Sequence, residues 1–132
     1  MDHETIIDDL LDDLKALRFG APVTHVYNPL EYARKPYSEY CKRYGRPAKE
    51  IVLVGMNPGP WGMAQTGIPF GEVNAVKEWL DIEAPVDQPA NMHPKRPVLG
   101  FGCRRSEVSG KRLWVGLRQG LKHRSIFFHD FS

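Results

Sequence analysis

The chain has 132 residues, of which 42% are hydrophobic and 26% charged, enough for one domain (1–132) with a single modest core. Its Asp- and Leu-rich start is unlike a secretory signal, and no apolar run suits a transmembrane helix. Two cysteines are too few for a disulfide scaffold or an iron–sulfur cluster, and no metal-ligand spacing occurs. We therefore expect an intracellular, reduced protein without cofactor, metal or membrane contact.

The net charge of +2 is unevenly distributed along the chain. Residues 1–20 carry six acids and two bases, a net of −4, whereas residues 91–132 carry nine bases and two acids, a net of +7. This asymmetry is typical of a protein with one face turned toward a polyanion. Surface charge also segregates by chance in small proteins, so charge alone leaves nucleic-acid binding open.

The N-terminal third predicts two helices. Six apolar residues recur at helical spacing opposite an acidic arc, which predicts an amphipathic helix over about 4–18: Ile6, Ile7, Leu10, Leu11, Leu14 and Leu17. We expect its acidic arc to be solvated. Residues 23–50 are rich in tyrosines, for which we favour half-buried packing over base stacking. A second helix is expected over about 36–44, closed by Gly45.

The apolar run Ile51–Val54 predicts a buried parallel strand over 51–56. A helix over about 72–80 should follow, with four residues inward: Val73, Val76, Trp79 and Leu80. An irregular proline-rich segment then leads to a helix over roughly 109–123, capped by Ser109, with Leu113, Trp114, Leu117 and Leu121 facing the core. A last strand is expected from Ile126 to Phe131. The order β-α-α-β predicts an α/β sandwich on a parallel sheet.

The last of these helices also carries basic residues on one side. Lys111, Arg118 and Lys122 are spaced at i, i+7 and i+11, which aligns them in a stripe. Such a stripe is more often a solvated helix face, but it could equally face phosphates.

The most informative segment is the loop 55–71, with the sequence GMNPGPWGMAQTGIPFG. It has no charged residue, and glycines and prolines fix its backbone and allow a ligand to approach closely. Amide and hydroxyl groups and two aromatic rings suit a flat, uncharged, hydrogen-bonding ligand such as a nucleobase. By composition alone such a loop is more commonly a simple turn. It matches neither the Walker loop nor the G-x-G-x-x-G pattern.

The amino-acid sequence of this loop resembles the active-site motif of the single-strand-selective monofunctional uracil-DNA glycosylases, a branch of the uracil-DNA glycosylase superfamily. Further segments resemble the same family in the same order: 26–33, 72–73, 93–100, 106–110 and 127–129. The resemblance implies a three-layer α/β/α sandwich on a central parallel sheet. It implies a monomeric base-excision-repair enzyme that flips uracil, or 5-hydroxymethyluracil, out of single- or double-stranded DNA and hydrolyses its N-glycosidic bond without a cofactor.

The resemblance also implies roles for individual residues. Asn57 would position the attacking water, and Phe70 would stack on the flipped base. Met56 and Gly59 would form walls near position 5 of the base, and Gln65 would contact base or phosphate. Outside the motif, Asn57 before a proline suggests only a turn, and Phe70 only core packing. His93 and His129 do not match the family's catalytic histidine.

The chain ends before the family's uracil-reading asparagine, its His-Pro-Ser-Pro segment and its wedge loop, so we expect it to represent the N-terminal part of the pattern. An alternative hypothesis is therefore a catalytically incompetent fragment that binds DNA or a partner through its basic C-terminal half. A weaker one keeps the enzyme class but shifts its specificity toward mismatched or deaminated-purine substrates.

Overall fold

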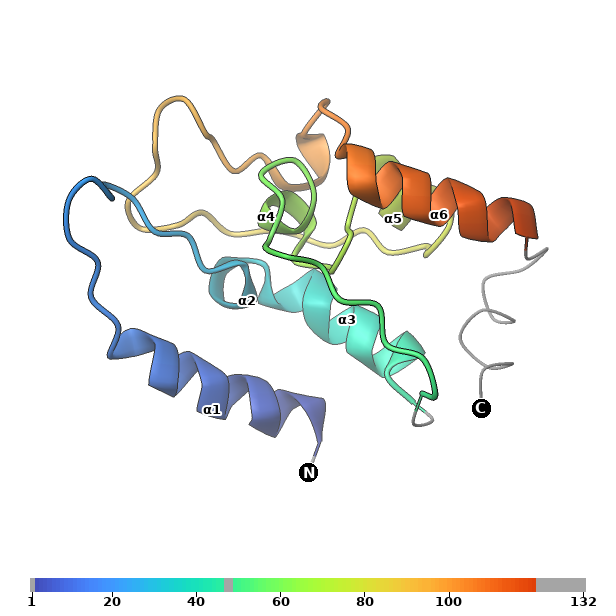
Figure 1. Ribbon diagram of the computed structural model, residues 1–132, viewed down its shortest axis with the longest axis horizontal. Coiled ribbons are helices and arrows are strands. Elements are labelled where there is room, and N and C mark those ends of the chain that lie inside the picture. Colours follow the sequence, from blue (N-terminus) through green and yellow to red (C-terminus); the bar gives the residue numbers. More distant parts are fainter. Residues whose placement is uncertain (1, 47–48, 121–132) are drawn as a thin grey trace.

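The computed structural model describes residues 2–46 and 49–120, and in this part the chain forms helices joined by long irregular segments (Figure 1). In chain order the elements are α1 (His3–Lys15), α2 (Pro29–Tyr32), α3 (Arg34–Tyr44), α4 (Met63–Thr66), α5 (Val73–Glu78), the 3-10 helix η1 (Gly100–Gly102) and α6 (Val108–Gly120). None of the helices in these ranges is long and apolar enough to span a bilayer.

Helix α1 confirms the predicted amphipathic helix, although it ends at Lys15. Asp2 is the N-cap of this helix, and its side chain accepts a hydrogen bond from the Thr5 amide at 2.8 Å. The helix lies against α2 and α3, and Arg34 of α3 donates to Glu4 and to Asp8, each at 2.9 Å. The remaining acidic residues of the arc are exposed as expected: Asp9, Asp12 and Asp13.

Helix α3 confirms the second predicted helix, with Gly45 following its last residue as the C-cap. The tyrosines around it pack as predicted. Tyr32 and Tyr44 are buried and donate to the carbonyl oxygens of Ala64 and Leu80, at 2.6 and 2.7 Å. Burial raises the pKa of Tyr40 to about 12. These phenols therefore tie α2 and α3 to the segments that follow.

The main core lies between α3, α5 and α6. All four residues predicted to face inward from the 72–80 helix are buried, and they pack in part with Ile68, Ile82 and Trp114. Leu113 and Leu117 of α6 are half-buried, whereas Leu121 lies outside the described residues. A smaller cluster joins Tyr32 and Ala33 to Val98 of the proline-rich segment.

The prediction that Ser109 caps the last helix is wrong. Ser109 lies inside α6, and the carboxylate of Glu107 accepts hydrogen bonds from the Ser109 amide, at 3.2 Å, and from the Gly110 amide. A carboxylate at this position also interacts favourably with the helix dipole. Glu107, the residue directly before α6, is therefore its N-cap.

The predicted strand over 51–56 is absent, and no strand is found in 2–46 or 49–120. Ile51 to Val54 pass in front of α3 in Figure 1, with Val52 74% and Val54 84% exposed. A strand exists only through hydrogen bonds to a neighbouring strand, and these ranges contain none. The parallel sheet of the predicted α/β/α sandwich is accordingly not observed, and the strand predicted at 126–131 lies outside the described residues.

Candidate functional site

The loop 55–71 is held in a fixed conformation around α4. Gly67 ends α4 with φ of 75°, and a Cβ atom at this position would lie 2.6 Å from the Ala33 carbonyl oxygen. Gly62 allows Glu107 to pack closely, because a Cβ there would lie 2.9 Å from the Glu107 Cγ. Glycine is therefore required at both positions, one for its backbone conformation and one for close packing.

Gln65 lies at the centre of this loop, only 2% exposed. Its Nε2 donates to the carbonyl oxygens of Pro60 and Pro97, both at 3.0 Å. Its Oε1 accepts from the amides of Leu99 and Gly100, at 2.7 and 3.1 Å. Two donors and two acceptor lone pairs are the full capacity of a primary amide. The side chain predicted to contact base or phosphate thus joins the loop to the segment 97–100.

Phe70 is held at the end of the loop in an uncommon conformation. Its φ is 52°, which is strained for a residue with a bulky side chain. The indole Nε1 of Trp114 donates to the Phe70 carbonyl oxygen at 2.8 Å, and the Glu72 amide donates to the same atom at 2.8 Å. The ring lies against Gly55, where a Cβ would be 3.3 Å from Phe70 Cζ. The surrounding structure therefore fixes the position of this ring.

Asn57 and Met56 lie on the surface between these features. The Nδ2 of Asn57 donates to the Pro58 carbonyl oxygen at 3.0 Å, and Met56 is 98% exposed. Neither residue lines the two cavities of about 540 and 410 Å³ that adjoin this loop, whereas Gln65 lines the first and Phe70 the second. The structure thus keeps the predicted site residues on one loop but does not bring them together around one cavity. Gly59, half-buried, packs against Glu107.

The cavity beside Phe70 has a volume of about 410 Å³ and is mainly apolar. Its walls come from the exposed run Ile51–Leu53, from α3 and from α6, including Tyr40, Tyr44, Trp114 and Leu117. Aromatic and aliphatic surfaces of this kind suit the face of a planar base, and they equally suit another apolar segment.

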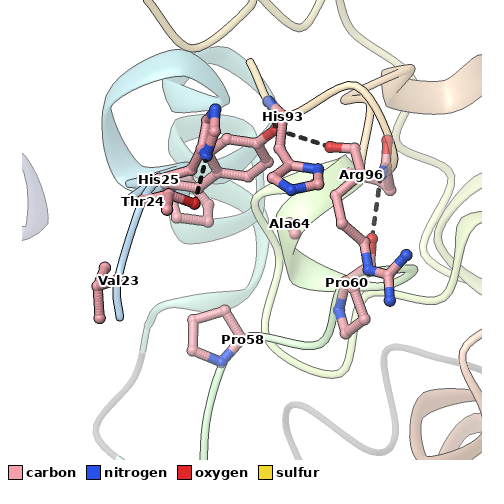
Figure 2. Close-up of a pocket in the computed structure, with 11 residues that line it drawn as sticks. Val23, Thr24, His25, Pro58, Pro60, Ala64, His93 and Arg96 are labelled. Atoms are coloured by element: carbon pink, nitrogen blue, oxygen red, sulfur yellow. Dashed lines mark hydrogen bonds between the residues drawn. The ribbon is translucent and has the colours of Figure 1, made fainter. Parts of the chain in front are cut away.

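A second cavity, of about 540 Å³, is lined in part by the loop residues Pro58, Pro60 and Ala64 (Figure 2). The labelled His25 and His93 lie on one side of it and Pro58 and Pro60 on the other. The two imidazole rings meet edge to face with centroids 4.6 Å apart. Tyr27 fixes this wall, since its hydroxyl donates to the Arg96 carbonyl and accepts from the His93 amide, both at 2.7 Å.

Two guanidinium groups lie over the indole ring of Trp61. Arg105 is 4.4 Å and Arg96 is 5.9 Å from the ring centroid. Both arginines are exposed, and among the residues in 2–46 and 49–120 neither forms an ion pair with a carboxylate. The uncharged loop is therefore bordered by cations that can attract phosphates.

Of the predicted basic stripe, Lys111 and Arg118 are exposed on α6, and Lys122 lies outside the described residues. The Arg118 guanidinium lies 5.8 Å from the Trp79 ring centroid. The two cysteines, Cys41 and Cys103, are buried free thiols, and burial raises the pKa of Cys41. No group of three or more metal-ligating side chains occurs within the described ranges.

Sequence reasoning missed Glu107, Arg96 and Arg105 as neighbours of the loop. A signal for Glu107 is present, because an acidic residue directly before a helical pattern is a common N-cap. The segment His93–Arg96 combines histidine, lysine and arginine, a signal for an anion site. Tertiary contact places Glu107 beside Gly59 and Gly62 and the two arginines beside Trp61, and no local sequence pattern encodes such contacts.

The geometry of the loop does not identify a protein family, but comparison with known proteins does. No protein-family model matches the chain. It is 51% identical over 116 residues to the single-strand selective monofunctional uracil DNA glycosylase of Mus musculus, and 50% identical over 119 residues to that of Bos taurus. These alignments cover 88% and 90% of the chain but only 42% and 44% of the relatives, so the chain spans less than half their length. Over most of its length, the chain is therefore homologous to the single-strand selective monofunctional uracil DNA glycosylases.

Proposed function

We propose that the chain carries part of the active site of a monofunctional DNA glycosylase that hydrolyses the N-glycosidic bond of uracil, or 5-hydroxymethyluracil, in DNA. The observation that carries this proposal is the identity of about 50%, over about 90% of the chain, to relatives named as monofunctional uracil DNA glycosylases. The rigid, uncharged loop 55–71, with cations beside it, supports it. Because the relatives are more than twice as long, the proposal concerns the whole protein to which this chain corresponds.

In the proposed reaction a water oxygen attacks C1′ of the deoxyribose while the bond from C1′ to the base nitrogen breaks. The bonding electrons leave with the base, the water loses a proton as the abasic sugar forms, and this proton neutralises the departing base, directly or through solvent. Asn57 orients this water: its Nδ2 is engaged with the Pro58 carbonyl, and its oxygen can accept a hydrogen bond from the nucleophile. A neutral amide is a weak base, so most of the acceleration must come from stabilising the departing base.

Phe70 provides the stacking surface for the extruded base in this scheme. Its strained backbone supports the role, because strain of this kind is often retained where a side chain must be presented in one orientation. Met56 and Gly59 form the walls near position 5 of the base. Gln65 acts indirectly, by fixing the loop that carries them. Lys111, Arg118 and Lys122 contact the DNA backbone.

The test is release of uracil from a single-stranded oligonucleotide, with alkali to cleave at abasic sites. Asn57→Ala should lower the rate by at least about a hundredfold, in the range typical of lost positioning and general-base contributions. Asn74→Ala, at an exposed position of α5, is the matched control and should behave as the unaltered chain. Equal and measurable rates of base release for the two variants would refute the role of Asn57.

A second candidate function is favoured by the exposed run Ile51–Val54 beside the Phe70 cavity. Apolar side chains exposed in sequence indicate a surface that another segment or protein covers. In this case the 132-residue chain alone binds DNA, or a partner, through its basic C-terminal half and releases no base. Salt-sensitive DNA binding that is unchanged in Asn57→Ala, without any base release, would support this candidate.

A further inference from the structure

We propose that the cavity of about 540 Å³ lined by His25, His93 and Arg96 is a second nucleotide site, which binds a single-stranded DNA nucleotide next to the one at Asn57. This inference rests on the proposed function, since it extends the DNA-binding surface of the same loop. The base lies against the imidazole rings and the prolines, and the phosphate lies at Arg96.

The first argument is position. Pro58 lines the cavity and directly follows Asn57, so the Cα atoms of the two residues are about 3.8 Å apart. Consecutive nucleotides of one strand are covalently joined, so the neighbour of a nucleotide at Asn57 stays close to it. A strand that places one nucleotide at Asn57 therefore brings a neighbouring nucleotide to this cavity.

The second argument is the chemistry of the walls. His25 and His93 are both half-buried, with ring edges and faces available on one side, while Pro58 and Pro60 provide apolar surface on the other (Figure 2). Rings that stack on the π-face of a base can bind any DNA sequence, because every base has such a face. Volumes of several hundred Å³ with few polar groups are typical of small-molecule sites, so the space is sufficient for one nucleotide.

The third argument is charge. The Arg96 Nη1 donates to the Lys95 carbonyl at 2.9 Å, which uses one of the five N–H groups of a guanidinium. The indole of Trp61 lies beneath Arg96, and Arg105 lies over the same ring at 4.4 Å. A planar guanidinium with several remaining donors suits a phosphate better than a lysine would. The site is thus cationic at one edge and aromatic within.

The experiment measures binding of a fluorescent oligothymidylate without uracil, by anisotropy, to the full chain. Arg96→Ala should raise Kd about tenfold and lower the slope of log Kd against log salt by about one, as expected for one lost phosphate contact. Lys35→Ala, which removes a charge at an exposed position of α3, is the control and should leave both quantities nearly unchanged. Equal effects of the two variants would overturn the phosphate assignment.

The base contact is tested with an oligonucleotide of the same length in which every base is replaced by hydrogen. The unaltered chain should bind it about tenfold more weakly than oligothymidylate. His93→Ala should reduce this difference, and His93→Phe, which keeps a ring, should retain it. His25→Ala provides an independent variant on the same wall, should His93→Ala disturb the fold. A difference that is the same in all four proteins would overturn the base contact.

Two further outcomes separate this inference from alternatives. Tighter binding of an RNA strand, or displacement of the oligonucleotide by thymidine monophosphate alone, would overturn the commitment to a DNA strand. Because none of these probes contains uracil, a failure of base release refutes only the proposed function. Conversely, Asn57-dependent release with no effect of the His93 and Arg96 substitutions on binding refutes only the second nucleotide site.

Discussion

The Oε1 of Gln65 accepts a hydrogen bond from the amide of Leu99 at 2.7 Å, across 34 residues of sequence. Through this bond and those to Pro97 and Gly100, the loop that carries Asn57 is fixed to the segment that follows Arg96. An amide with all four hydrogen-bonding positions used is a rigid connection in a site where little polar surface is exposed. The geometry of the loop therefore depends on a residue that contacts main chain on every side.

Gln65→Ala should lower the free energy of unfolding by about 2–4 kcal/mol, because it leaves two amides and two carbonyls without their partner. Urea unfolding followed by circular dichroism measures this. Gln119→Ala, at an exposed position of α6, is the matched control and should change stability by less than about 0.5 kcal/mol. Similar losses for the two variants would show that the Gln65 bonds do not stabilise the fold.

Gly67→Ala should destabilise the chain by about 2 kcal/mol or more, since the new Cβ adds a clash with Ala33 to the strain of a positive φ. Gly116→Ala offers the opposite case: it lies in α6, and a Cβ there has no atom within 4 Å. This second substitution should stabilise by about 0.5–1 kcal/mol through helix propensity. Melting temperatures that move in the same direction for both variants would contradict this account.

Trp114→Phe should cost about 1 kcal/mol more than Trp79→Phe. The Trp114 indole donates to the Phe70 carbonyl, whereas the buried Nε1 of Trp79 has no hydrogen-bond partner in the described structure. Both substitutions remove a similar volume from the core and keep an aromatic ring, including the one that Arg118 contacts at Trp79, so the lost hydrogen bond is the main difference between them. Paired urea titrations measure it. If the two losses are equal, the contact to Phe70 contributes nothing to stability.

The contact between α1 and α3 should weaken in acid. Hydrogen bonds from Ser38 and Arg34 hold the pKa of Glu4 below its ordinary value of 4.5. A depressed folded-state pKa means that the contribution to stability is present above pH 4.5 and is lost as pH falls through the lower, folded-state value. Glu4→Gln should remove this part of the pH dependence, and Asp13→Asn, at an exposed position, should retain it. Unfolding midpoints measured from neutral pH into acid test the difference.

The helices α1, α3, α5 and α6 and the inward residues of α5 could be predicted from the sequence, since they follow from the periodicity of apolar residues over a few turns. The family relationship could be predicted as well, through the loop and the segments around it. The roles of Gln65 and Glu107, the strained backbone of Phe70 and the position of Arg96 over Trp61 could not be predicted from the sequence. Each of these depends on contacts between distant segments. The same reason explains why Ile51–Val54, a strand by its pattern, is not one here: a strand needs a hydrogen-bonded neighbour, and the described part of the chain provides none.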